Sequence, residues 1–312
     1  MKAIILFFTI GLGLISILSF RSTPQLVEKR KEKPKISFTF DDGDASDKPN
    51  YPLKKWNQLL LDHLEKHQLK AILFATGSRL NSKKGQHILS SWNNARHGIA
   101  NQTYSHPYFN SKKVTLKEFE NDFLRNDSLI NTYSNHLNYF RFPYLKEGNT
   151  IEKRDGFRKF LIEQNHLNGH VTIDASDWYI DSRMLKKMKQ DPTIDLSKFK
   201  DFYIKHIYDR ACYYDQLAFQ LTGRRIKHSL LLHHNLTSAL FLEDLILHFK
   251  KMGWETINAE EAYKDVIYKQ VPTNIPAGES LIWALCKQTG KYDKLLMYPA
   301  ESGEYEKVKM DL

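Results

Sequence analysis

The chain has 312 residues, of which 41% are hydrophobic and 12% aromatic, and it carries a formal net charge of +10. This is enough hydrophobic sequence for the core of one large domain or two ordinary ones. The positive charge favours acidic partners, but no Arg/Lys-rich tract with interleaved aromatic residues lies in the folded part, so we expect no nucleic-acid binding. The two cysteines, Cys212 and Cys286, have no CxxC spacing, and both a disulfide and two buried free thiols stay open.

The N-terminal segment of the chain is apolar. Residues 1–21 contain Lys2 and then an almost unbroken apolar run, which predicts a secretory signal or an uncleaved anchor. Basic residues after this run outnumber those before it, and the positive-inside rule therefore argues against simple export. Residues 22–35 contain proline and charge without periodicity, which predicts a linker.

The rest of the chain alternates between predicted strands and helices. Apolar runs and apolar–polar alternation predict strands at 36–40, 70–76, 98–101, 138–142, 170–173, 229–232 and 255–258. Apolar residues at helical spacing predict helices at 51–68, 86–96, 116–133, 151–164, 196–221, 239–251 and 260–266. About seven repeats of strand and then helix indicate an α/β fold with a parallel sheet, as a closed barrel or an open doubly wound sheet. We expect this body to span 36–267 and to carry a C-terminal tail, 268–312, packed on it.

The first of these strands leads directly into Asp41-Asp42-Gly43. Side chains on a strand alternate between its faces, so the two carboxylates are expected to make different contacts. One can bind a metal while the other handles a proton, and Gly43 allows a sharp turn beside a ligand. An isolated Asp-Asp-Gly would be an ordinary polar turn, so this interpretation depends on the clusters that follow.

Four further clusters follow predicted strands. They are Gln102-Thr103-Tyr104-Ser105-His106-Pro107, Arg141-Phe142-Pro143-Tyr144, Asp174-Ala175-Ser176-Asp177-Trp178 and Leu230-Leu231-Leu232-His233. The carboxyl ends of parallel strands meet at one edge, where βα barrels place their active sites. In this order, the clusters resemble those of the polysaccharide deacetylase family, the NodB-type carbohydrate esterases, over roughly residues 35–266.

That resemblance implies a distorted (β/α) barrel of about seven strands and an extracytoplasmic hydrolase that removes acetyl groups from amino sugars with a divalent metal such as zinc. The implied roles are Asp41 as general base, His233 as general acid, Arg141 and Asp177 as the pair that positions and tunes the base, Tyr144 as a backbone donor to the oxyanion, Trp178 and Leu231 as the acetyl-methyl pocket, and Asp42, His106 and Gln102 as metal ligands. The expected partner is an acetylated polysaccharide or peptidoglycan, with membrane contact only through the N-terminal segment. The family's habit of export is our reason to expect an extracytoplasmic location.

One position departs from the family pattern. The family has two metal-binding histidines four residues apart, and the first of them is Gln102 in this chain. A neutral amide is a poorer zinc ligand than imidazole. Metal binding could be weaker or shift to a harder ion, another residue such as Asp44 or His97 could replace the ligand, or the barrel could bind glycan without cleaving it. An O-acetyl esterase on the same scaffold is a further alternative.

Overall fold

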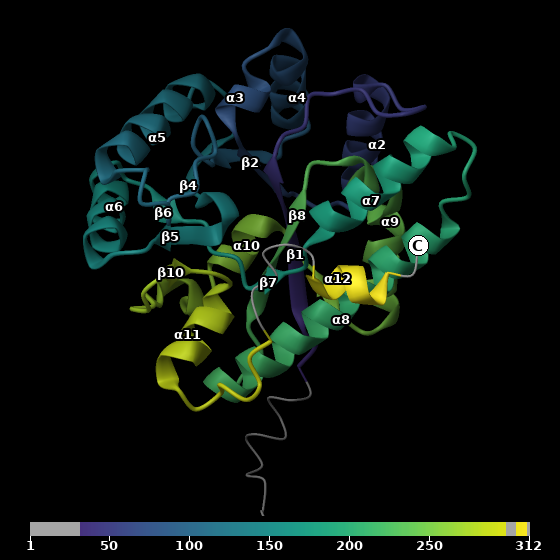
Figure 1. The fold of residues 1–312 in the computed structure, drawn as a ribbon. Helices are drawn as coiled ribbons and strands as arrows, with labels where there is room; N and C mark the ends of the chain where they lie inside the picture. The colour runs from purple at the N-terminus through teal and green to yellow at the C-terminus, as the bar shows by residue number, and fades with distance from the viewer. Residues whose placement is uncertain (1–31, 298–303, 311–312) are drawn as a thin grey trace, which may run out of the picture.

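The computed structural model describes residues 32–297 and 304–310, and its centre is a curled parallel sheet (Figure 1). The predicted signal or anchor and most of the predicted linker lie outside the described residues. Seven strands form this half-barrel in the order β6-β4-β3-β2-β1-β8-β7, and β9 pairs with the start of β1. The predicted α/β fold with about seven parallel strands is confirmed. The sheet order begins at β6 and ends at β7, so the pairings of the described residues leave the barrel open.

The strands of this sheet are short except at its centre. They are β1 Lys35–Asp42, β2 Ile72–Ala75, β3 Gly98–Asn101, β4 His136–Phe140, β6 Leu167–Asn168, β7 Ile173–Asp174, β8 Lys227–His233 and β9 Glu255–Thr256. A separate two-stranded sheet pairs β5 Lys146–Gly148 with β10 Ala277–Gly278. The helices are α2 Leu53–Lys66, α3 Gly77–Leu80, α4 Lys83–Asn94, α5 Leu116–Ile130, α6 Ile151–Glu163, α7 Asp177–Gln190, α8 Ser197–Thr222, α9 Leu236–Lys251, α10 Ala259–Tyr263, α11 Leu281–Thr289 and α12 Glu304–Lys309.

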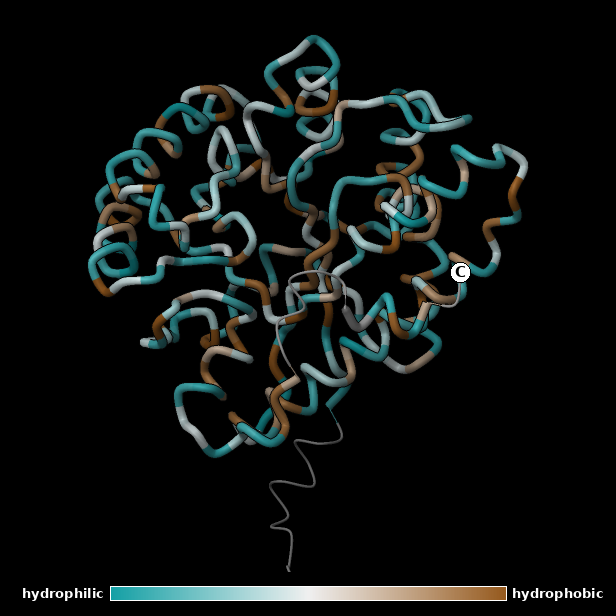
Figure 2. The backbone as a smooth tube through the Cα atoms, in the orientation of Figure 1, coloured by the Kyte–Doolittle hydropathy of each residue, from teal (hydrophilic) through white to brown (hydrophobic). Residues whose placement is uncertain are grey.

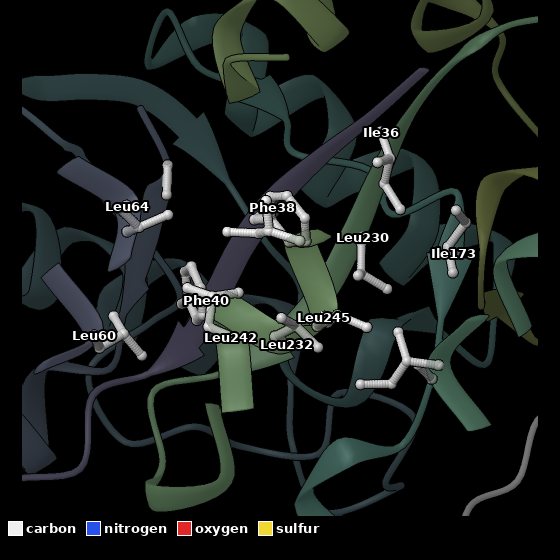
Figure 3. Close-up of a cluster of buried hydrophobic side chains, with 14 of the residues drawn as sticks. Ile36, Phe38, Phe40, Leu60, Leu64, Ile173, Leu230, Leu232, Leu242 and Leu245 are labelled. Carbon is white, nitrogen blue, oxygen red and sulfur yellow. The ribbon is translucent and has the colours of Figure 1, made fainter. Parts of the chain in front are cut away.

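The two faces of β1 have different chemistry, and this difference positions the site. Ile36, Phe38 and Phe40 point away from the barrel interior into a core shared with α2 and α9 (Figure 3). Ser37, Thr39 and Asp41 alternate with them and therefore lie on the inner face. Figure 2 shows the hydrophobic segments concentrated in the interior and the hydrophilic ones along the outer helices and loops. Burial of the apolar face fixes the register, because a slip of one residue would turn the aspartate outward.

Several elements differ from the sequence-based expectations. The stretch after Asp177 forms α7, where we had expected no helix, and the strand expected at 170–173 is reduced to Ile173–Asp174. Beyond residue 268 the chain contains β10 and α11, and α11 packs against α8. Cys212 and Cys286 are both free, which favours the thiol alternative. Within the described ranges, no helix combines the length and apolar character needed to cross a membrane.

Candidate active site

A cavity of about 660 Å³ lies at the carboxyl ends of the central strands. Eight of the ten predicted site residues line it, and the two that do not are Arg141 and Asp177. The lining residues are Asp41, Asp42, Arg79, Gln102, His106, Tyr108, Tyr144, Leu145, Lys146, Asp174, Ser176, Trp178, Leu231, His233 and Glu279. Motifs from distant parts of the sequence therefore meet in one cavity, as the order of the clusters predicted.

Asp41 is buried and both of its carboxylate oxygens accept hydrogen bonds. Arg141 Nη1 donates to Oδ1 over 2.6 Å, and Gln102 Nε2 donates to Oδ2 over 2.9 Å. Arg141 is held in turn by Thr39 Oγ1, by the carbonyl of Gly169 and by the hydroxyl of Tyr263. The guanidinium is therefore oriented from several sides, and Arg141 is placed to tune Asp41 as expected.

Asp42 makes a different set of contacts. Its backbone φ of 78° is left-handed, which breaks the strand alternation and lets its carboxylate line the same cavity as Asp41. Arg79 Nη1 lies 2.8 Å from Asp42 Oδ2, and His106 Nε2 lies 3.2 Å from Asp42 Oδ1. The adjacent Gly43 has a φ of 89°, and a Cβ there would come within 2.6 Å of Leu80. This close approach of α3 to the turn brings Arg79 to Asp42.

Gln102 does not offer its carbonyl oxygen to a metal. Its Oε1 accepts the backbone N–H of Asp42 over 2.8 Å and the hydroxyl of Thr76 over 3.2 Å, while its Nε2 donates to Asp41. Both ends of the amide are thus used by the protein. The expectation that Gln102 is a metal ligand is not supported, because the ligand atom already accepts two hydrogen bonds.

His233 ends the strand next to β1, in register with Asp41, and is held by Asp177. The ring Nδ1 is 2.6 Å from Asp177 Oδ1, and the backbone N–H of His233 donates to Oδ2 over 2.9 Å. We had expected Asp177 to tune the base together with Arg141, and this is wrong. Strand β8 lies between β1 and β7, so a residue that follows β7 meets His233 before it can reach Asp41.

The pairings give the two groups opposite charges at neutral pH. Burial raises the pKa of Asp41 to about 6, although the nearby Arg141 opposes the rise. Burial works against the charged form of His233, but the Asp177 carboxylate outweighs it and raises the pKa of His233 to about 10. Asp41 is therefore mainly ionised and His233 mainly protonated at pH 7, as a base and an acid require.

The remaining walls are aromatic and aliphatic. Trp178, Leu231 and Tyr144 all line the cavity, and Tyr144 takes a left-handed φ of 56° with its ring packed against His106. The sequence reasoning missed Arg79 and the buried ion pair of Lys146 with Glu279, which also line it. Arg79 follows a strand within a few residues, which is a signal that could have indicated it.

The histidine next to His233 has a structural role. His234 is buried, its Nδ1 accepts the backbone N–H of Asp44, and its Nε2 contacts Asn57 Oδ1. Its ring also packs on Trp56. These contacts use both ring nitrogens, so His234 is not available to a substrate.

The residues in the cavity do not fit a resident zinc ion of the expected kind. A catalytic zinc is bound by three protein ligands and a water, and Asp42 and His106 supply two. Gln102 is engaged in hydrogen bonds, and neither Asp44 nor His97 lines the cavity. Asp44 pairs with Lys48, and His97 Nδ1 accepts the backbone N–H of Ala71. The substitution of another residue for the missing ligand is therefore not supported.

Comparison with known proteins agrees with the fold and the motifs. The polysaccharide deacetylase family model matches residues 28–158, which contain the first three clusters. Over these residues the chain is similar to the polysaccharide deacetylase family. No curated protein sequence matches it.

Solved structures resemble this chain at low sequence identity. The CE4 family pseudoenzyme BA3943 from Bacillus anthracis has a TM-score of 0.51 at 16% identity, covering 74% of this chain and 66% of its own. A BA3943 mutant with restored enzymatic activity has the same TM-score at 18% identity, covering 74% of this chain and 68% of its own. The Bc1960 peptidoglycan N-acetylglucosamine deacetylase, in complex with an N-hydroxybenzamide compound, also has a TM-score of 0.51 at 21% identity, covering 74% of this chain and 88% of its own. At these identities the likeness shows the fold.

Proposed function

We propose that this chain hydrolyses the N-acetyl group of an amino-sugar polymer such as a cell-wall glycan. The observation that carries the proposal is the presence of two oppositely charged groups, each held by its own partner, on the walls of one cavity: Asp41 with Arg141, and His233 with Asp177. The family supports hydrolysis of an amide bond, and the Bc1960 structure is that of a peptidoglycan N-acetylglucosamine deacetylase. Trp178 and Leu231 supply the apolar wall for the acetyl methyl group.

In this proposal Asp41 removes a proton from water as the water oxygen attacks the acetyl carbonyl carbon. The carbon–nitrogen bond then breaks, and protonated His233 donates its proton to the leaving nitrogen. The products are acetate and the free amine of the sugar. Asp177 keeps His233 protonated until it donates its proton to the leaving nitrogen. Arg141 keeps Asp41 ionised until it takes the proton from water.

The negative charge that develops on the acetyl oxygen needs a positive partner. The cavity residues do not form a set of zinc ligands. We therefore assign the stabilisation of this negative charge to Arg79, whose guanidinium lines the cavity beside Asp42. A fixed cation in a partly buried site stabilises an oxyanion by charge and by hydrogen bonds. This assignment replaces the metal dependence that the family resemblance implies.

The test is acetate release from N-acetylated chitin oligosaccharides and from peptidoglycan, before and after treatment with EDTA. We expect release that survives EDTA and falls at least ~100-fold in Asp41→Asn. Asp47→Asn is the matched control, since Asp47 is exposed and does not line the cavity. Acetate release that is unchanged in Asp41→Asn would refute the proposal. Acetate release that requires zinc would show that Arg79 does not stabilise the oxyanion. Faster release from O-acetylated than from N-acetylated substrates would instead identify an esterase.

A second candidate function is glycan binding without turnover. It is favoured by the contacts of Asp41, whose two oxygens already accept hydrogen bonds from Arg141 and Gln102, so that neither oxygen is free of a protein partner when a water approaches. A chain of this kind would bind chitin oligosaccharides in calorimetric titration and release no acetate. Weaker binding in Trp178→Ala would place the glycan in the cavity.

We also propose an extracytoplasmic location for this activity. The support is the apolar segment 1–21, which lies outside the described residues, together with the polymeric nature of the proposed substrate. Fractionation of cells that express the full chain tests it, with recovery in the cytoplasmic fraction as the opposing result.

A further inference from the structure

A second group of metal-ligating side chains lies outside the cavity. Asp127 is near the end of α5, His136 is the first residue of β4, and His166 directly precedes β6. One ligand atom from each of the three side chains falls within 4.8 Å of the others. None of the three lines the cavity. We call this group the Asp127 cluster.

The distances within the Asp127 cluster are those of a shared metal. Asp127 Oδ1 lies 3.3 Å from His166 Nε2 and 3.5 Å from His136 Nε2. A charge-assisted hydrogen bond between these groups would be about 2.7–2.9 Å long. Ligands bound to tetrahedral zinc at about 2.0–2.1 Å are about 3.3–3.4 Å apart. The observed spacing therefore matches two ligands on one ion better than a direct hydrogen bond.

The orientation of His166 adds an independent reason. Its Nδ1 lies 2.8 Å from the carbonyl oxygen of Gln164, which can only accept, so Nδ1 carries a proton. In the neutral ring, Nε2 then presents a lone pair toward the Asp127 carboxylate. That nitrogen is buried and has no hydrogen-bond partner among the described residues, and neither has Nε2 of His136. The His166 lone pair and the Asp127 carboxylate face one another, and the unpartnered His136 Nε2 lies beside them, which is an arrangement that a bound cation would satisfy.

The surroundings of the cluster suit a bound ion. The His166 ring packs edge-on against Phe123, with the ring centroids 4.9 Å apart, which fixes its direction. A metal-binding histidine commonly donates its other ring N–H to a backbone carbonyl, as Nδ1 of His166 does. The Asp127 side chain keeps 22% of its surface exposed, which leaves an entry path from solvent. Two imidazoles and one carboxylate are a donor set typical of zinc.

We propose that Asp127, His136 and His166 bind a zinc-class divalent cation that fastens α5 to β4 and β6. Strand β6 is short and stands at the end of the sheet order, where the half-barrel stays open. An ion here ties this edge to α5, which also packs against α6 and β3. The site is structural, because three ligands from α5, β4 and the β6 boundary meet away from the cavity.

The test uses the full chain, stripped of metal with EDTA and dialysed, in calorimetric titration with ZnCl₂. We expect one zinc ion per chain from this cluster, a rise in thermal midpoint on zinc addition, and at least ~10–100-fold weaker binding in His136→Ala. His106→Gln, in the cavity, is the matched control and should leave both readouts unchanged. Asp127→Asn preserves size and keeps the test valid should His136→Ala fail to fold.

The visible absorption of bound cobalt gives a second readout. It would not depend on these side chains if they only packed within the fold and bound no metal. Co²⁺ in the wild-type chain should show the strong visible absorption of a tetrahedral site, and Asp127→Asn should lose it. Zinc binding that survives His136→Ala and disappears in His106→Gln would overturn the proposal, as would a folded wild-type chain that takes up no zinc. None of these readouts depends on acetate release.

Discussion

Breaking the buried ion pair of Arg141 and Asp41 should destabilise the fold strongly. Their side chains are only 1% and 3% exposed. Arg141→Met keeps an unbranched stem but leaves the Asp41 carboxylate buried without its cation. Removing one partner of a buried pair costs about 3–5 kcal/mol of the free energy of unfolding. The loss of the contacts with Gly169 and Tyr263 adds to this cost. Urea unfolding followed by circular dichroism measures it.

The loss of stability caused by Arg141→Met should be larger at high pH than at low pH. Burial already raises the pKa of folded Asp41 to about 6, above its value in the unfolded chain, so the folded state loses stability as pH rises through this range. Without Arg141 the folded pKa rises further, because the opposing charge is gone. The loss caused by Arg141→Met should therefore be larger at about pH 8 than at about pH 5, where Asp41 is mostly protonated.

Two controls separate the ion pair from general damage. In an Asp41→Asn background, Arg141→Met leaves no buried charge without a partner. The loss in the free energy of unfolding should therefore be about 1–3 kcal/mol smaller than in the wild type. Lys84→Met removes the exposed partner of Asp47 and should cost about 0–1 kcal/mol at either pH. Equal costs for Arg141→Met in both backgrounds and at both pH values would refute the reasoning.

Three further predictions concern the cavity. Acetate release should rise with pH through about 6, as Asp41 loses its proton, and fall through about 10, as His233 loses its own, and a profile of kcat/KM against pH tests both limbs. Trp178→Ala should raise KM about 10-fold with kcat nearly unchanged, because it removes a wall and no reacting group; a selective loss of kcat would contradict this. Gln102→His combined with Arg79→Gln should raise zinc affinity in the cavity at least ~10–100-fold, measured by titration in a chain whose Asp127 cluster carries His136→Ala, and an unchanged affinity would show that another contact blocks the metal.

Local patterns were sufficient to predict the centre of the sheet and insufficient at its edges. Strands β1 and β8 are long, buried and paired along their length, so their apolar residues are visible in the sequence. Strands β6 and β7 contain two residues each, and too few side chains alternate there to give a pattern. Helix α7 was missed because it begins at Asp177 itself, directly after Ser176 in a left-handed conformation, so its first residues were assigned to the polar end of a strand.

The sequence motifs indicated which residues gather in the cavity. Which of these residues are hydrogen-bonded to one another depends on the order of the strands in the sheet. Asp41 and His233 are paired in register on neighbouring strands, and this could be expected from two motifs at the same edge. The assignment of Asp177 to Asp41 failed because β8 separates the two, and no local pattern states that order. Arg79 was missed for a related reason, since its role depends on how closely α3 approaches the turn at Gly43.

Gln102 and Arg79 are best understood together. A metal ion in such a site would balance the charge of Asp42 and orient it, and in this chain other groups perform both tasks. Arg79 and His106 contact one carboxylate oxygen each, and Gln102 accepts the backbone N–H of Asp42 while it donates to Asp41. Burial by itself raises the pKa of Asp42, yet His106, His233 and Arg79 keep it below the ordinary value, so the carboxylate stays ionised without a metal. Replacing Gln102 alone by histidine would place an imidazole beside a carboxylate that already has a guanidinium partner. The double change with Arg79 is therefore the substitution that the geometry requires before a zinc ion can compete for Asp42.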